Sequence, residues 1–191
     1  MLQQQLVFIA LITLLTQLSG CSTTATTNTG RVGAAATDQR SVGTVMDDEI
    51  IEINASNALY QDKTLNEQTH VNFTSYNFIV LITGETPSKA LKSRIEQIVK
   101  SIPKVRRVHN MLNIAAPSSM LSRTSDATLT LRIKTAMVGE GDLAHRVKVV
   151  TENGTTYLMG LTSRQQGAKA VSITQQISGV QKIVKLFEYV D

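Results

Sequence analysis

Apolar and polar positions between residues 47 and 116 follow helical and strand periodicities in the order helix, strand, strand, helix, strand. In the first helix, Ile51, Ala55 and Leu59 belong to one apolar stripe at helical spacing. Residues 71–74 and 108–114 show strand alternation, and residues 78–83 form a continuous apolar run. A helical stripe lies between Pro87 and Pro103. The predicted elements are a helix from Asp47 and Asp48, strands over residues 71–74 and 78–83, a helix between Pro87 and Pro103, and a strand over residues 108–114.

The same order of periodicities follows between residues 124 and 191. Leu129, Ile133 and Met137 repeat the helical stripe, and Asn153-Gly154 is a strong signal for a two-residue β-hairpin. The predicted elements are a helix capped by Ser125 and Asp126, strands over residues 147–152 and 155–159, a helix over residues 164–177, and a strand over residues 180–190.

Matching positions indicate that the second half duplicates the first. Gly84 and Gly160 end the second strand of each half and lie 76 residues apart, and Val105 and Val180 open the third strand and lie 75 residues apart. A nearly constant offset is the signature of an internal repeat. We therefore expect two small α+β domains, each with two helices packed on a three-stranded mixed sheet. The expected domains are residues 46–116 and residues 124–191, joined by a linker over residues 115–123.

The N-terminal residues have the pattern of a bacterial lipoprotein precursor. Residues 1–20 carry no charged side chain, and the apolar stretch over residues 6–18 has the length of a signal-peptide core. The sequence Leu-Ser-Gly-Cys that ends at Cys21 resembles a lipobox, in which the cysteine becomes the lipidated N-terminus. Residues 21–45 are rich in Thr, Ser, Ala and Gly and are expected to form a flexible tether.

Charge is distributed unevenly between the two halves. Of the formal net charge of +4, residues 47–116 contribute none, because eight acidic side chains balance eight basic ones, whereas residues 123–191 contribute +3. We therefore expect the second domain to meet an anionic surface, with a slightly basic solvated surface as the alternative. We expect no nucleic-acid partner.

The sequence offers no arrangement of side chains typical of catalysis. His70, His109 and His145 lie far apart, and no pair has the spacing of a helical or hairpin metal site. The acidic residues at positions 47–49 are explained by a helix N-terminus. The single cysteine excludes an internal disulfide bond. We therefore expect a protein that is not an enzyme and has no metal site and no cofactor.

The two halves resemble BON domains. In that family a glycine ends the second strand, and a pair of valine-like residues opens the third. In the first half Gly84 matches the glycine, and Val105 and Val108 match the pair. Gly160, Val180 and Ile183 take these places in the second half. Two copies behind a lipobox resemble the dual BON-domain lipoproteins of Gram-negative bacteria. With Ser22 after the lipidated cysteine, the resemblance implies attachment to the periplasmic face of the outer membrane.

This resemblance also carries implications for function. It implies binding of anionic phospholipid, such as phosphatidylglycerol, through the second BON domain, and a role in outer-membrane integrity at division sites. The alternative is a protein adaptor for a periplasmic regulator of septal peptidoglycan hydrolases or for the outer-membrane barrel assembly machinery.

In the family the lipid contact lies at the first helix of the second domain. The corresponding candidate residues are Thr128, Leu129, Arg132, Ile133, Lys134 and Met137. Arg132 and Lys134 would meet the headgroups while the apolar members meet the acyl boundary. In the alternative interpretation the three apolar side chains belong to the core and the two cations are merely solvated.

Overall fold

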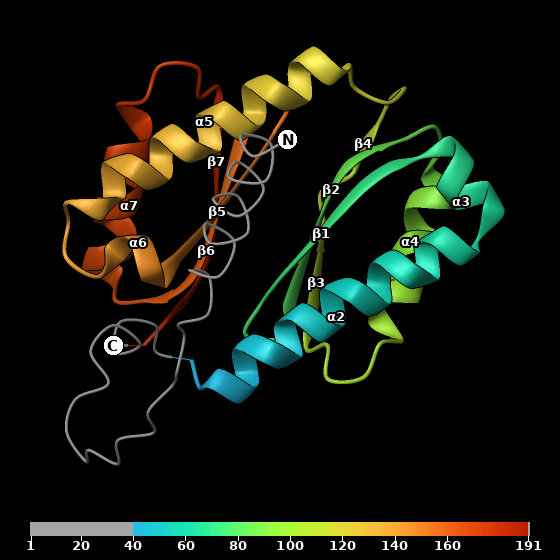
Figure 1. Cartoon of the computed structure of the whole chain (residues 1–191), viewed down its shortest axis with the longest axis horizontal. Helices are drawn as coiled ribbons and strands as arrows, with labels where there is room; N and C mark the ends of the chain where they lie inside the picture. Colours follow the sequence, from blue (N-terminus) through green and yellow to red (C-terminus); the bar gives the residue numbers. More distant parts are fainter. Residues whose placement is uncertain (1–39, 191) are drawn as a thin grey trace, which may run out of the picture. The chain divides into compact units, whose positions relative to one another are not determined.

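The structure is a computed structural model in which residues 40–190 are described (Figure 1). The predicted signal peptide, Cys21 and most of the predicted tether lie outside the described residues. All described residues belong to one compact unit. Among the helices within residues 40–190, none is both long enough and apolar enough to cross a membrane.

The first domain is a mixed sheet with helices on one face (Figure 1). Its strand order is β1-β2-β3, with β1 antiparallel and β3 parallel to the central strand β2, and the short β4 also pairs with β2 in parallel. The elements are α2 (Val42–Gln61), α3 (Lys63–Gln68), β1 (His70–Tyr76), β2 (Ile79–Thr86), α4 (Lys89–Lys100), β3 (Arg107–Asn110) and β4 (Asn113–Ile114).

The second domain repeats this topology with a three-stranded sheet in the order β5-β6-β7. Strand β5 is antiparallel and β7 parallel to the central strand β6. The elements are α5 (Met120–Val138), α6 (Leu143–Arg146), β5 (Val147–Glu152), β6 (Thr155–Thr162), α7 (Arg164–Gln175) and β7 (Lys182–Tyr189). The predicted α+β fold with two α-β-β-α-β domains is confirmed, and the short α3 and α6 are additions that the sequence pattern did not predict.

The first helix of each domain begins earlier than predicted. Helix α2 starts after Ser41, whose hydroxyl accepts the amide of Thr44, and α5 starts after Ser119, whose hydroxyl accepts the amide of Ser122. The predicted starts at Asp47 and Ser125 were therefore wrong by five residues or more. The last residues assigned to the tether and to the linker are helical, because a serine at the N-cap satisfies an otherwise free backbone amide.

Asp48 and Asp126 do not cap these helices but lie buried in their interiors. The Asp48 carboxylate accepts the backbone amides of Asn77 and Phe78, the turn residues between β1 and β2. Both turn residues have positive φ. The predicted role of Asp48 at a helix N-terminus was wrong, because its carboxylate instead satisfies the amides of a strained turn in the neighbouring sheet.

Gly84 and Gly160 lie inside β2 and β6, and the prediction that they end these strands was wrong. At both positions the neighbouring first strand comes close to the glycine backbone. A Cβ at Gly84 would lie 2.0 Å from the carbonyl oxygen of His70, and one at Gly160 would lie 2.3 Å from that of Arg146. Gly84 also has a φ of 113°, which side-chain-bearing residues rarely adopt. The repeated glycines of the sequence thus reflect a steric requirement of this strand pairing.

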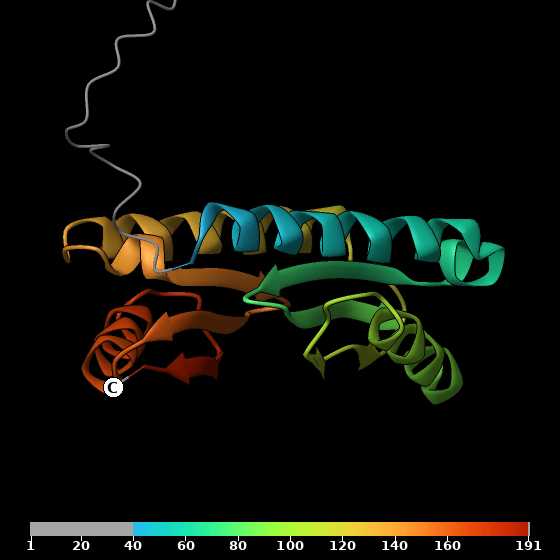
Figure 2. The same ribbon diagram turned by 90° about the horizontal axis from the view of Figure 1, so that it is seen from below.

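The central strands are buried on both faces. Val80 and Ile82 of β2 face the helices of their own domain, whereas Ile79 and Leu81 belong to a second cluster shared with the other domain. The members of that shared cluster are Tyr76, Ile79, Leu81, Tyr157 and Met159, with Met111, Val150, Leu161, Val184 and Leu186 packed against it. The two sheets therefore pack against each other through the faces that their helices leave open. Figure 2 shows α2 over β1 and α5 over β5 on the same side of the unit.

Polar contacts border this shared cluster. Arg106 Nη2 lies 2.7 Å from a carboxylate oxygen of Glu188, and Asn77 Nδ2 donates to the same oxygen at 2.7 Å. The hydroxyl of Tyr76 donates to the carbonyl of Arg146 at 3.2 Å. Each contact joins one domain to the other, so the pair is fixed by polar as well as apolar interactions.

Candidate functional site

Helix α5 is attached to its sheet by a buried face. Leu129, Ile133 and Met137 are 7%, 0% and 0% exposed and form the core with β5, β6 and α7. These three side chains were candidate lipid contacts, and the structure places them in the core of the second domain, where only Leu129 reaches the wall of an open hollow. The alternative interpretation, in which they are core residues, agrees with the structure, because their spacing of four places them on one helix face.

The opposite face of α5 is exposed and carries an alternation of apolar side chains and threonines. Leu131 is 66% exposed, and Leu121 and Val138 are exposed on the same stripe. Thr124, Thr128 and Thr135 lie between them at spacings of three and four, and they are also exposed. Thr128 is thus the only uncharged member of the predicted set on the solvent side. The apolar residues of this stripe were missed because their signal is interrupted by threonine.

Two cations border this stripe. Arg132 and Lys134 are both exposed, and their positions on the helix lie on opposite edges of the stripe. Arg132 Nη1 donates a hydrogen bond to the carbonyl oxygen of Ser178 at 3.0 Å, which holds the guanidinium beside the loop between α7 and β7. A guanidinium has five N–H donors, so this bond leaves others directed outward.

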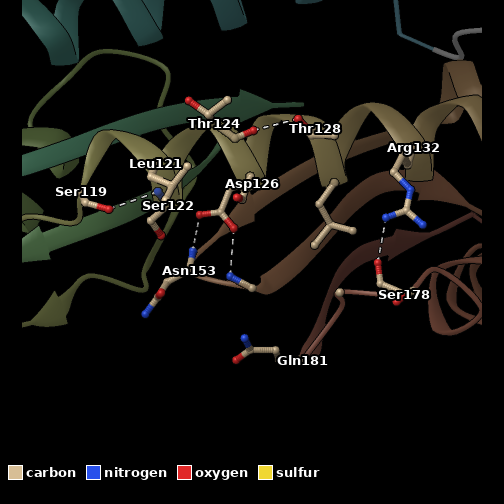
Figure 3. A pocket seen from close by; sticks show the side chains of 14 residues that line it. Ser119, Leu121, Ser122, Thr124, Asp126, Thr128, Arg132, Asn153, Ser178 and Gln181 are labelled. Carbon is tan, nitrogen blue, oxygen red and sulfur yellow. Dashed lines mark hydrogen bonds between the residues drawn. The ribbon is translucent and has the colours of Figure 1, made fainter.

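An open hollow of about 640 Å³ lies beside the first half of α5 (Figure 3). Its walls come from α5, from the turn between β5 and β6, and from the loop between α7 and β7. Hydroxyls of Ser122, Ser125 and Thr128 and the side chains of Arg132 and Gln181 line it. A surface of hydroxyls, an amide and a guanidinium offers hydrogen-bond donors to a phosphate-sized anion.

Asp126 also lines this hollow, and its carboxylate already has partners. It accepts the backbone amides of Asn153 at 2.7 Å and Gly154 at 3.0 Å, as the dashed lines of Figure 3 show. These two bonds direct both carboxylate oxygens to the turn, while the negative charge remains and opposes an anion in the hollow. The sequence pattern could not reveal this role, because the three residues meet only in the folded domain.

Helix α2 presents the corresponding face of the first domain with different chemistry. Met46, Ile50, Ile53 and Tyr60 are exposed along one stripe. The helix contains four acidic residues and no lysine or arginine. The two exposed stripes therefore share apolar character and differ in charge.

The three histidines lie on separate elements. His109 is in β3, where burial, followed by the nearby Arg107, lowers the pKa of its imidazole. His145 is exposed in α6. His70 is in β1, where its Nδ1 lies 2.9 Å from Glu85 Oε2. The absence of a catalytic group remains an expectation from the sequence.

Comparison with known proteins identifies the domains. The BON domain family model matches residues 47–116 and residues 125–191. The outer membrane lipoprotein DolP of Haemophilus influenzae is 36% identical over 164 residues, which cover 85% of this chain and 85% of the relative. A 21 kDa hemolysin of Actinobacillus pleuropneumoniae is 29% identical over 154 residues, which cover 80% of this chain and 79% of that protein.

Among solved structures, the C-terminal domain of CdsD, a type III secretion protein of Chlamydia trachomatis, matches 75% of this chain with 15% identity. The match covers 67% of that structure with a TM-score of 0.30. The family model accounts for most of the chain, and the DolP relative aligns across both domains. The chain therefore belongs to the BON-domain family, as a dual BON-domain outer-membrane lipoprotein of the DolP type.

Proposed function

We propose that this lipoprotein binds anionic phospholipid through α5 of its second BON domain and so maintains the integrity of the outer membrane at division sites, on its periplasmic face. In this proposal Cys21 supplies the covalent anchor and α5 supplies a second, headgroup-directed contact. Two attachments hold a protein at a membrane more stably than one.

The observation that carries this proposal is the exposed face of α5. Leu121, Leu131 and Val138 supply the apolar surface that an interfacial helix places at the acyl boundary. Arg132 and Lys134 flank that surface at the position of the headgroup phosphates. The hydroxyl-lined hollow beside Arg132 offers further donors to a headgroup.

Vesicle sedimentation of residues 34–191 tests this contact without the lipid anchor. Vesicles of phosphatidylglycerol should carry the fragment down, and vesicles of phosphatidylcholine should not. Each cation near an anionic surface contributes about 1 kcal/mol, so the double variant Arg132→Glu, Lys134→Glu should bind at least about 30-fold more weakly. Binding should also weaken as salt rises, because exposed charges are screened.

Two matched variants distinguish vesicle binding by the exposed face of α5 from nonspecific hydrophobic binding to vesicles. Leu131→Glu should weaken binding because it places a charge in the exposed stripe of α5. Ile53→Glu makes the same change at the corresponding, 55% exposed position of α2 and should leave binding unchanged. Equal losses from both variants, or binding to both vesicle types that is insensitive to salt, would contradict the proposal.

A second candidate function, a protein adaptor, is favoured by the exposed stripe of α2. Its apolar residues recur at spacings of four, three and seven, the spacing of a helix face that packs on another helix. Its acidic surroundings do not suit an anionic membrane. They suit a protein with an apolar face bordered by basic side chains, such as a regulator of septal hydrolases or an outer-membrane assembly factor.

Photo-crosslinking in cells tests the adaptor function directly. A photoreactive residue at Ile50 should give one defined protein adduct, and the adduct should persist in the Arg132→Glu, Lys134→Glu variant. Ile53→Glu should abolish it. An adduct that disappears with the α5 charge reversals would show that protein contact depends on membrane docking and would remove the case for an independent adaptor surface.

A further inference from the structure

Three potential metal-ligating side chains converge where the two domains meet. They are His70 of β1, Glu85 of β2 and Glu152 of β5, and one ligand atom from each lies within 4.8 Å of the other two. His70 and Glu85 are directly opposite in the antiparallel ladder of the first domain. Glu152 is the last residue of the first strand of the second domain.

The two carboxylates are withdrawn from water. Glu85 and Glu152 are 3% and 6% exposed, and the His70 side chain is 19% exposed. Buried carboxylates in this proximity call for a proton or a cation between them.

The described hydrogen bonds neutralise this charge only in part. Glu152 Oε2 accepts from Asn72 Nδ2 at 3.0 Å, and Glu85 Oε2 accepts from the amide of Ser118 at 3.2 Å. Arg123 lines the adjacent hollow, but its guanidinium donates to the carbonyl and hydroxyl of Ser118. Both bonds come from neutral donors, and within the cluster His70 Nδ1 lies 2.9 Å from Glu85 Oε2. Two carboxylates therefore face at most one imidazolium charge, so the cluster retains negative charge that a divalent cation would neutralise.

We propose that His70, Glu85 and Glu152 form a binding site for a divalent transition-metal ion, for which Zn²⁺ is the probe, and that this ion joins the two BON domains. An imidazole with two carboxylates suits zinc and its neighbours, whereas calcium and magnesium prefer ligand sets made of oxygen alone. The three side chains leave a further coordination position for water, as zinc sites with three protein ligands do.

The geometry requires only a small adjustment. Ligands around a tetrahedral zinc ion at bond lengths of about 2.0 to 2.2 Å lie roughly 3.3 to 3.6 Å apart. A separation of 4.8 Å would therefore close by roughly 1.5 Å, whereas the 2.9 Å between His70 Nδ1 and Glu85 Oε2 would open slightly. The strand pairing fixes the backbone of His70 and Glu85, so side-chain rotation of Glu152 can supply this movement. A hollow of about 340 Å³, lined by His70 and Glu152 among others, gives an entry path from solvent.

A metal ion here would act on the interface and not on a substrate. His70 and Glu85 belong to the first domain and Glu152 to the second, so binding is linked to the docking of the two domains. An ion that binds only the docked state stabilises that state by mass action. Domain packing, and with it the relative placement of the exposed faces of α2 and α5, would then respond to the metal supply.

Zinc binding is measured on the full-length chain in detergent, stripped of metal with a chelator, with Cys21→Ser in every variant so that no thiol competes. Titration against a chromophoric chelator should give one Zn²⁺ per chain. His70→Gln and Glu152→Gln should each weaken Zn²⁺ binding at least tenfold. Zn²⁺ should raise the melting temperature of the parent chain and of neither variant, and Ca²⁺ or Mg²⁺ should have no such effect.

The other two histidines supply matched controls. His109→Gln and His145→Gln should bind Zn²⁺ as the parent chain does. Absence of zinc binding in the parent overturns the proposal, and so does undiminished binding in Glu152→Gln, because the second domain would then contribute no ligand. Should His70→Gln fail to fold, Glu152→Gln decides alone, since glutamine keeps the size of the side chain and still accepts from Asn72. These outcomes are independent of vesicle binding by α5.

Discussion

The first helices of the two domains align at a constant offset in the sequence, yet they present different surfaces. Ser41 and Ser119 cap them, and Asp48 and Asp126 accept the amides of the following turns at an offset of 78 residues in both cases. The buried frame of the repeat is therefore retained in both copies, down to single hydrogen bonds.

The exposed residues of the same helices are where the copies diverge. Arg132 and Lys134 of α5 correspond to Asn54 and Ser56 of α2, and α5 carries three basic residues where α2 carries none. A duplicated fold needs the same internal contacts in both copies, whereas solvent-facing positions are free to acquire separate chemistry. The two domains therefore differ most in the chemistry of the exposed faces of α2 and α5.

The largest loss of stability is expected when the two strand glycines are replaced. Gly84→Ala and Gly160→Ala both place a Cβ against a backbone carbonyl, and Gly84→Ala also forces a positive φ on alanine. We expect each to lower the free energy of unfolding by about 3 kcal/mol or more, with the larger loss at Gly84. Urea unfolding followed by circular dichroism measures this. Equal losses would show that the φ of Gly84 adds no strain.

The next effect concerns the two buried aspartates. Asp48 accepts from Arg40, Ser75, Asn77 and Phe78, whereas Asp126 accepts from Asn153 and Gly154. Replacement by alanine leaves buried donors without acceptors. Each such group lowers the free energy of unfolding by about 1 to 3 kcal/mol.

Asp48→Ala should therefore destabilise the protein more than Asp126→Ala does. Urea unfolding of both variants measures the difference. Asp47→Ala, which changes a neighbouring aspartate that pairs with Lys104 at the surface, is the control and should cost less than about 1 kcal/mol. A greater loss at Asp126 than at Asp48 would contradict the reading of the hydrogen bonds.

A smaller effect concerns the residue before each turn, which is Tyr76 in the first domain and Glu152 in the second. Because burial raises the pKa of Glu152, the folded state binds its proton more tightly than the unfolded state does. This group therefore costs stability as the pH rises from about 4.5 through the raised pKa, and the cost is absent below both values.

In chelator at pH 7.5, Glu152→Gln should melt at the same temperature as the parent or a few degrees above it, and the difference should vanish near pH 4. Added Zn²⁺ should reverse the order at pH 7.5. Differential scanning fluorimetry across this pH range measures both. A variant that is less stable than the parent at pH 7.5 in chelator would show that the ionised carboxylate stabilises the fold.

The smallest expected effect is a gain of lipid binding by the first domain. Asn54→Arg with Ser56→Lys gives α2 the two cations of α5 at the corresponding exposed positions. Combined with Arg132→Glu and Lys134→Glu, the transfer should restore part of the phosphatidylglycerol binding, several-fold above the charge-reversed variant. Restoration should be incomplete, because Asp47 and Glu49 remain on α2. Vesicle sedimentation measures the gain, and no gain would show that the hollow beside α5 is required.

Much of the fold was predictable from local pattern. The hairpin at Asn153 and Gly154 and the helix between Pro87 and Pro103 lie where the sequence analysis predicts them, whereas Gly84 and Gly160 lie inside β2 and β6 and do not end them. Turn chemistry and periodicity act over a few residues and can be identified without knowing what packs where. The start of α2 was missed for a local reason. The sequence up to Met46 is rich in small and polar residues, so it gives no apolar stripe by which a solvent-exposed helical turn could be predicted.

The candidate site was predicted only in part. The family resemblance named the helix, the two cations and Thr128 as candidates, and the structure places these side chains on the exposed side. Leu129, Ile133 and Met137 were assigned to both lipid and core as alternatives. Periodicity reveals that a helix has an apolar stripe without stating whether a sheet or a membrane covers it. In the structure β5, β6 and α7 bury these three side chains. Leu131 became a candidate contact only when the structure showed that it is exposed.

The sequence alone determined the α-β-β-α-β order of the main elements, the duplication and the family, because each depends on residues close together in the chain or on a repeated spacing. Only the tertiary structure decided that the open faces of the two sheets pack on each other, and that His70 and Glu85 meet Glu152. Asn72 and Glu152, hydrogen-bonded at this junction, are 80 positions apart. No local pattern encodes such a meeting, because it depends on the packing of one domain against the other.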